Sequence, residues 1–185
     1  MNKVFSCAYD INIKIYYQDT DSIHMNYDDV PKIVDRYKQT YNQYLVGEYL
    51  GKFHVDFELD GSVSDIYSKE NYFLGKKPYI DSLESTDEYG SVINTEHIRM
   101  RGIPTSCIKY EADKNNITVL DIYKRLFNGE AIQFDLTNDN SKFVCKNNKD
   151  HTVSNITDFT RKTKFIRNDE DKIFINEYDL FFVNI

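Results

Sequence analysis

Two aspartates separated by a single threonine are the residues of this chain best suited to chemistry. Asp19 and Asp21 lie in the segment 17–22, YQDTDS. Carboxylate oxygens are the ligands that Mg²⁺ prefers, and the ion fills the rest of its shell with waters and substrate phosphates. Paired ions of this kind clamp the attacking and leaving oxygens of a phosphoryl transfer. Asp19 and Asp21 are therefore candidate catalytic and metal-binding residues, with Mg²⁺ as the candidate cofactor.

The residues on either side of the aspartates predict the turn that would present them. Segments 12–17 (NIKIYY) and 22–25 (SIHM) are rich in β-branched and aromatic residues, which favour strands. Two strands this close in sequence must form a hairpin. We therefore expect both carboxylates at or near the tip of a β-hairpin.

Other interpretations of two aspartates on a turn exist. Asp is favoured in solvated turns that bind nothing. A calcium loop counted from Asp19 would need Gly at its sixth position and Glu at its twelfth, and this chain has His24 and Val30. A metal-dependent glycosyltransferase would need a nucleotide-binding half upstream, and 18 residues precede Asp19. That class, together with a nuclease, stays an alternative.

The rest of the chain predicts an α+β fold. A helix capped by Asp28 or Asp29 follows, with Pro31 in its first turn. Its apolar face consists of Ile33, Tyr37, Tyr41 and either Tyr44 or Leu45. Strands are predicted at 53–58, 65–74, 78–83 and 97–101, with a hairpin loop at 84–90. A second helix at 119–128 begins with a capping box of Thr118 and Asp121, and strands follow at 131–136 and 142–145.

Composition sets limits on the class of protein. The 185 residues are 41% hydrophobic with a net charge of -7, which weighs weakly against nucleic-acid binding but allows local basic clusters. Three widely spaced cysteines, Cys7, Cys107 and Cys145, favour reduced thiols in an intracellular protein. No apolar run has the length of a membrane span. A boundary near 104–117 predicts two regions, 1–104 and 105–185, and the basic stretch 161–167 is interpreted as a solvated face rather than a DNA contact.

Several segments in the same order resemble family B DNA polymerases of the protein-primed branch, found in viruses, linear plasmids and virus-like transposons. The segment 17–22 resembles motif C of that family. Downstream, 50–58 (LGKFHVDFE) resembles its LGxF…E segment, 75–80 (GKKPYI) its KxY motif, and 97–104 (HIRMRGIP) the basic element that leads into the thumb. The likeness covers 11–104. It implies that 1–104 is the C-terminal part of an antiparallel palm sheet with a packed helix, and that 105–185 is a small mixed thumb-like region.

The resemblance also implies roles for individual residues. Asp21 would bind the catalytic metals directly, and Asp19 more weakly or indirectly. The turn would be supported by Tyr17, Thr20 and Ser22. Contacts to the primer strand or the DNA duplex would come from Lys76, Lys77, Tyr79, Arg99 and Arg101. The implied partners are a DNA primer–template, a deoxynucleoside triphosphate and a terminal priming protein.

Two elements of the family are missing from this sequence. Neither the motif A aspartate nor the fingers helix of motif B appears. A truncated reading frame, a split gene whose partner chain carries motifs A and B, and a non-catalytic DNA-binding remnant are all compatible with that absence. We therefore expect this chain to have no polymerase activity by itself, and to derive from a virus or a mobile element.

Overall fold

The computed structural model describes residues 1–136, 160–164, 172–175 and 179–184, which form helices and antiparallel sheets. The α+β class is therefore as predicted. Among the described residues, eight strands belong to one sheet, in the order β1-β2-β10-β4-β5-β6, with β3 paired to β10 and β9 paired to β4. A separate antiparallel pair joins β7 (Ala131–Asp135) to β8 (Thr160–Lys164). The predicted strand at 142–145, Cys145 and the side chains of the basic stretch 161–167 lie outside this description.

The predicted hairpin is present, with shifted bounds. Strand β1 (Ile15–Asp19) pairs antiparallel with β2 (Ser22–Asn26), and Asp19 lies opposite Ser22. β1 starts later than expected because Asn12 adopts a left-handed conformation with φ 56°, which ends the preceding turn. It also continues through Gln18, so that Thr20 and Asp21 alone make the turn. Thr20 has φ 55°, in the left-handed region that tight two-residue turns require.

The longest ladder is formed by β4 (Tyr67–Phe73), β5 (Tyr79–Thr86) and β6 (Val92–Arg99). The predicted hairpin loop was placed too early, since β5 continues to Thr86. Asp87 closes the turn by accepting hydrogen bonds from the backbone N–H groups of Tyr89 and Ser91, at 2.9 and 2.8 Å. Tyr79 pairs with Arg99 and Asp81 pairs with His97 across β5 and β6.

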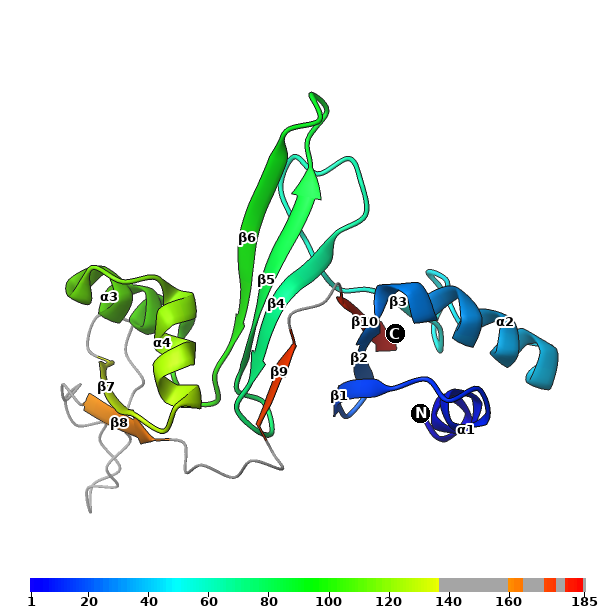
Figure 1. The fold of residues 1–185 in the computed structure, drawn as a ribbon, viewed down its shortest axis with the longest axis horizontal. Coiled ribbons are helices and arrows are strands. Elements are labelled where there is room, and N and C mark those ends of the chain that lie inside the picture. Colours follow the sequence, from blue (N-terminus) through cyan, green and yellow to red (C-terminus); the bar gives the residue numbers. More distant parts are fainter. Residues whose placement is uncertain (137–159, 165–171, 176–178, 185) are drawn as a thin grey trace, which may run out of the picture.

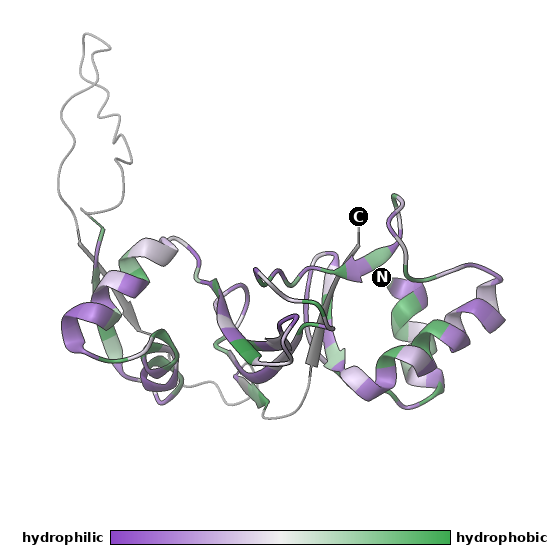
Figure 2. Cartoon of the chain, turned by 90° about the horizontal axis from the view of Figure 1, so that it is seen from above, coloured by the Kyte–Doolittle hydropathy of each residue, from purple (hydrophilic) through white to green (hydrophobic). Residues whose placement is uncertain are grey.

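Helices lie on both sides of this ladder (Figure 1), and the helices of each side belong to a hydrophobic core of their own. In one, α1 (Asn2–Asp10) and α2 (Val30–Tyr41), which follows the 3-10 turn η1 (Tyr27–Asp29), pack on β2 and on β3 (Phe53–Val55). In the other, α3 (Thr105–Asn115) and α4 (Val119–Phe127) pack on the ladder and β7. Helices at both ends carry hydrophilic as well as hydrophobic residues, as helices with a single buried face do (Figure 2).

The helix predictions were correct in part. α4 has the expected capping box of Thr118 and Asp121. α2 ends at Tyr41 because Asn42 has φ 51°, which places Tyr44 in solvent and leaves Leu45 buried in the following loop. Helices α1 and α3 were not predicted. α3 occupies the segment that was interpreted as a domain boundary.

The last strands of the chain return to the first sheet. β9 (Ile173–Ile175) pairs with β4, and β10 (Asp179–Asn184) pairs with β2, β3 and β4. The region beyond residue 104 therefore contributes α3, α4, β7 and β8 at one end of the molecule and two strands to the sheet itself. In the described part of the chain, no helix has both the length and the apolar character needed to cross a bilayer.

Candidate functional site

The hairpin tip holds both candidate carboxylates at the surface. Ser22 Oγ donates a hydrogen bond of 2.9 Å to the backbone carbonyl of Asp19, which closes the turn. Thr20 Oγ1 donates to Asp19 Oδ1 at 3.1 Å. Thr20 and Ser22 thus hold the turn by side-chain hydrogen bonds, as expected of hydroxyl residues at such positions. Ser22 bonds to the backbone, whereas Thr20 bonds to the carboxylate itself.

Tyr17 connects the hairpin to the turn between β4 and β5. Its ring stacks on Phe73, with ring centroids 4.6 Å apart, and contacts Tyr79 at 5.4 Å. Its hydroxyl oxygen accepts a 2.8 Å hydrogen bond from the backbone N–H of Lys77, a residue with φ 79°. Burial raises the pKa of the Tyr17 hydroxyl, so the group stays neutral at physiological pH. Two segments sixty residues apart are thereby fixed against each other.

The two carboxylates differ in their surroundings. Lys77 Nζ lies 3.5 Å from Asp19 Oδ2, so both oxygens of Asp19 have a partner. Asp21 is exposed and, within the described residues, makes no hydrogen bond or ion pair. This asymmetry leaves Asp21 open to bind a cation, while a cation at Asp19 must compete with the Lys77 ammonium.

The expected basic residues gather at one end of the β4–β6 ladder. Lys76 and Lys77 precede β5, and the register that pairs Tyr79 with Arg99 brings Arg101 to the same end. Lys76, Lys77, Arg99 and Arg101 are all exposed. Tyr79 is 5% exposed, and its ring lies among aromatic side chains rather than in solvent. In this structure Tyr79 supports the site from below and offers no surface for DNA.

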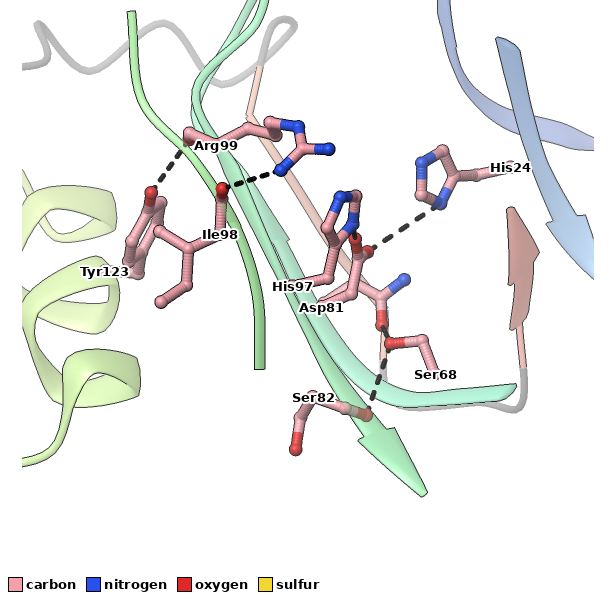
Figure 3. Close-up of polar contacts among 9 residues, drawn as sticks. His24, Ser68, Asp81, Ser82, His97, Ile98, Arg99 and Tyr123 are labelled. Atoms are coloured by element: carbon pink, nitrogen blue, oxygen red, sulfur yellow. Dashed lines mark hydrogen bonds and ion pairs between the residues drawn. The ribbon is translucent and has the colours of Figure 1, made fainter. Parts of the chain in front are cut away.

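A buried polar cluster that sequence reasoning missed lies behind the hairpin (Figure 3). The Nδ1–H of His97 donates to Asp81 Oδ2, with the two atoms 2.8 Å apart. His24 approaches from β2, on the other side, with its Nδ1 3.8 Å from Asp81 Oδ1. The side chains of His24 and Asp81 are fully buried. The only sign of this cluster in the sequence was Asp81, a charged residue at an inward-facing position of a strand.

The cluster links the strand of the hairpin to the ladder. His24 lies three residues beyond Asp21, and Asp81 lies four residues beyond Lys77. Aromatic rings enclose the His24 imidazole, with the centroids of Phe73 and Tyr79 at 4.9 and 5.5 Å. Burial lowers the pKa of His24 from 6.5 to about 4, despite the opposing attraction of Asp81. His24 is therefore neutral at physiological pH, and it packs β2 against side chains of β4 and β5.

The residues present can supply part of a magnesium site. Asp19 and Asp21 offer hard oxygen ligands at an exposed turn, which suits a cation that keeps several waters. Among the described residues, no group of three or more His, Cys, Asp or Glu side chains is arranged to hold a metal ion. A metal bound here would therefore take its other ligands from water, from substrate phosphates or from another polypeptide segment.

Replacing Tyr17 by Phe tests the link between the hairpin and Lys77. The substitution keeps the stacked ring and removes the acceptor, so we expect unfolding to become easier by about 0.5–1.5 kcal/mol. We also expect the Lys77 amide proton to exchange faster in a hydrogen-exchange measurement followed by NMR. Tyr9→Phe is the matched control because Tyr9 is 88% exposed. An unchanged exchange rate at Lys77 would contradict this account.

Acidification tests the buried histidine. A histidine whose pKa is lower in the folded than in the unfolded chain has no effect on stability above pH 6.5 and destabilises the fold as the pH falls from 6.5 to 4. With His24 near 4, this group removes about 3 kcal/mol across that window. His24→Phe should flatten this part of the pH profile in urea unfolding. A profile as steep as that of the unsubstituted chain would mean that other groups cause the loss.

Comparison with known proteins finds no relative of this chain. The chain matches no protein-family model, no curated protein and no solved structure. The features that bear on function are therefore the arrangement of the carboxylates, Tyr17 and the basic residues, and the motif resemblance in the sequence.

Proposed function

We propose that this chain is the C-terminal palm and thumb-like part of a family B DNA polymerase of the protein-primed branch. The observation that carries the proposal is the contact between Asp19 and Lys77, 3.5 Å apart in space and 58 residues apart in sequence (77 − 19). The two residues belong to separate segments that resemble motif C and the KxY motif. A solvated turn with no function has no need to lie beside a basic segment of this kind.

The site residues fit the chemistry of template-directed nucleotidyl transfer. In that reaction the primer 3′-hydroxyl oxygen, or a hydroxyl of a priming protein, attacks the α-phosphorus of a deoxynucleoside triphosphate. A new P–O bond forms, the bond to the pyrophosphate breaks, and the proton of the attacking hydroxyl passes to solvent. Magnesium supplies charge neutralisation at the phosphates and lowers the barrier to attack. Catalysis of this kind depends on positioning and on electrostatic stabilisation rather than on a covalent step with the protein.

Each group of residues has a part in that reaction. Asp21 would hold the metal directly, and Asp19 would be the second, weaker ligand. Lys77 and Lys76 would bind phosphates of the primer strand, and Arg99 and Arg101 those of the duplex, because exposed cations suit phosphate contacts. Tyr17, Tyr79 and His24 would hold these groups in place from the interior. The remaining carboxylate would come from a preceding polypeptide segment or a separate chain.

Nucleotide incorporation tests the proposal. The chain by itself, with primer–template, dNTPs and Mg²⁺, should incorporate nothing. The chain joined to, or mixed with, the product of the reading frame directly upstream should extend the primer. Asp21→Asn should lower that activity at least about a hundredfold, since a metal supplies several kcal/mol of transition-state stabilisation. Asp60→Asn, an exposed aspartate of the loop after β3, is the matched control.

DNA binding separates the remaining interpretations. Lys77→Ala should weaken binding of the isolated chain to a primer–template duplex and reduce the slope of log affinity against log salt by about 1. Binding that depends on Lys77, with no activity in the presence of the upstream product, would identify a non-catalytic remnant. Absence of both DNA binding and activity would overturn the polymerase proposal, leaving a glycosyltransferase or a nuclease to be tested.

A further inference from the structure

The carboxylate of Asp19 already lies beside a positively charged side chain of the same polypeptide, that of Lys77. Its Oδ2 faces the Lys77 ammonium at 3.5 Å, and its Oδ1 accepts from Thr20. Asp21, two residues away, is exposed and has no such partner within the described part of the chain. The hairpin therefore presents one free carboxylate and one whose charge Lys77 balances.

The backbone, rather than the ion pair, determines where Lys77 lies. Its N–H is bound to Tyr17 Oη at 2.8 Å, and Tyr17 is stacked on Phe73. The next residue, Pro78, is buried at the start of β5. The Cα of Lys77 is thus held from both sides, whereas its side chain, a flexible stem that ends in the ammonium group, is 57% exposed. The ammonium can leave Asp19 without any change in the fold.

We propose that the Lys77 ammonium occupies the cation position at Asp19 and is displaced when a divalent metal binds to Asp19 and Asp21. The proposal rests on the metal site of the proposed function. Displacement leaves Lys77 without a carboxylate partner at the moment when the metal attracts phosphates to the hairpin. Metal binding at Asp19 and phosphate binding at Lys77 then favour each other, because coupling of this kind is reciprocal.

The affinity of the isolated chain for Mn²⁺ measures how strongly the Lys77 ammonium competes with a metal ion for Asp19. Mn²⁺ is paramagnetic, so a titration with MnCl₂ reports its affinity through broadening of the backbone amide resonances of residues 19–22. Lys77→Met keeps the apolar stem and removes the ammonium. We expect it to tighten Mn²⁺ binding about two- to fivefold, the range that exposed ion pairs produce. Lys77→Arg should keep the affinity of the unsubstituted chain to within about twofold, because it keeps the charge.

A double-mutant cycle separates displacement from simple repulsion. In an Asp19→Asn background the ammonium has no carboxylate to leave, so Lys77→Met should no longer change Mn²⁺ binding at Asp21. Lys114→Met is the matched control for loss of a positive charge. The side chain of Lys114 is 58% exposed, nearly as much as that of Lys77. It pairs with Glu111 on α3, which belongs to the hydrophobic core that α3 and α4 form with β7 and the ladder.

The outcomes are distinct. Tighter binding in Lys77→Met that disappears in the Asp19→Asn background supports the proposal. Equal affinities, weaker binding, or the same tightening in both backgrounds would overturn it and leave the proposed polymerase function standing. Absence of Mn²⁺ broadening at residues 19–22 in every variant would overturn the displacement proposal, whereas primer extension with the upstream product decides the polymerase function separately.

Discussion

The contact between Tyr17 and the turn before β5 is the constraint on which the candidate site depends. The ring of Tyr17 packs against both Phe73 and Tyr79, and its hydroxyl accepts a hydrogen bond from the backbone of Lys77. Aromatic packing of this kind contributes about 0.5–1.5 kcal/mol for each pair beyond the burial of its area. Without it, an exposed pair such as Asp19 and Lys77 would have no fixed geometry, since exposed ion pairs are individually weak.

The buried cluster of His24, Asp81 and His97 adds polar contacts where the hairpin packs on the ladder. Asp81 lies between two histidines, and it is held by His97 from the neighbouring strand while His24 reaches it from the hairpin. A buried carboxylate without partners would cost several kcal/mol, and the hydrogen bond from His97 to Asp81, between β6 and β5, offsets part of that penalty. The aromatic contacts around Tyr17 and the packing of His24 against Asp81, 3.8 Å away, both hold the hairpin against the ladder. Together they define the position of the hairpin tip.

Local patterns in the sequence predicted the local parts of the structure. The hairpin followed from two β-rich runs around a polar turn, and α4 followed from its capping box and apolar spacing. Helices α1 and α3 were missed because their short apolar patterns, with a β-branched or aromatic residue among them, do not separate helix from coil. The polar cluster was not predictable, because it joins His24 and Asp81 across 57 residues (81 − 24) and depends on the packing of three strands. The proximity of Lys77 to Asp19 could be expected only from the family resemblance.

The position of β10 has a consequence for how the chain reaches this structure. This strand is the last in the sequence, yet it lies between β2 and β4, with Phe182 opposite Ile23. During synthesis on the ribosome, the hairpin and the β4–β6 ladder emerge early but lack the strand that joins their hydrogen-bonded edges. Both edges stay open until β10 has left the ribosome, and such pairing over long sequence distances is slow. A nascent chain that has not yet reached β10 therefore exposes two unpaired strand edges, which favour aggregation and chaperone binding.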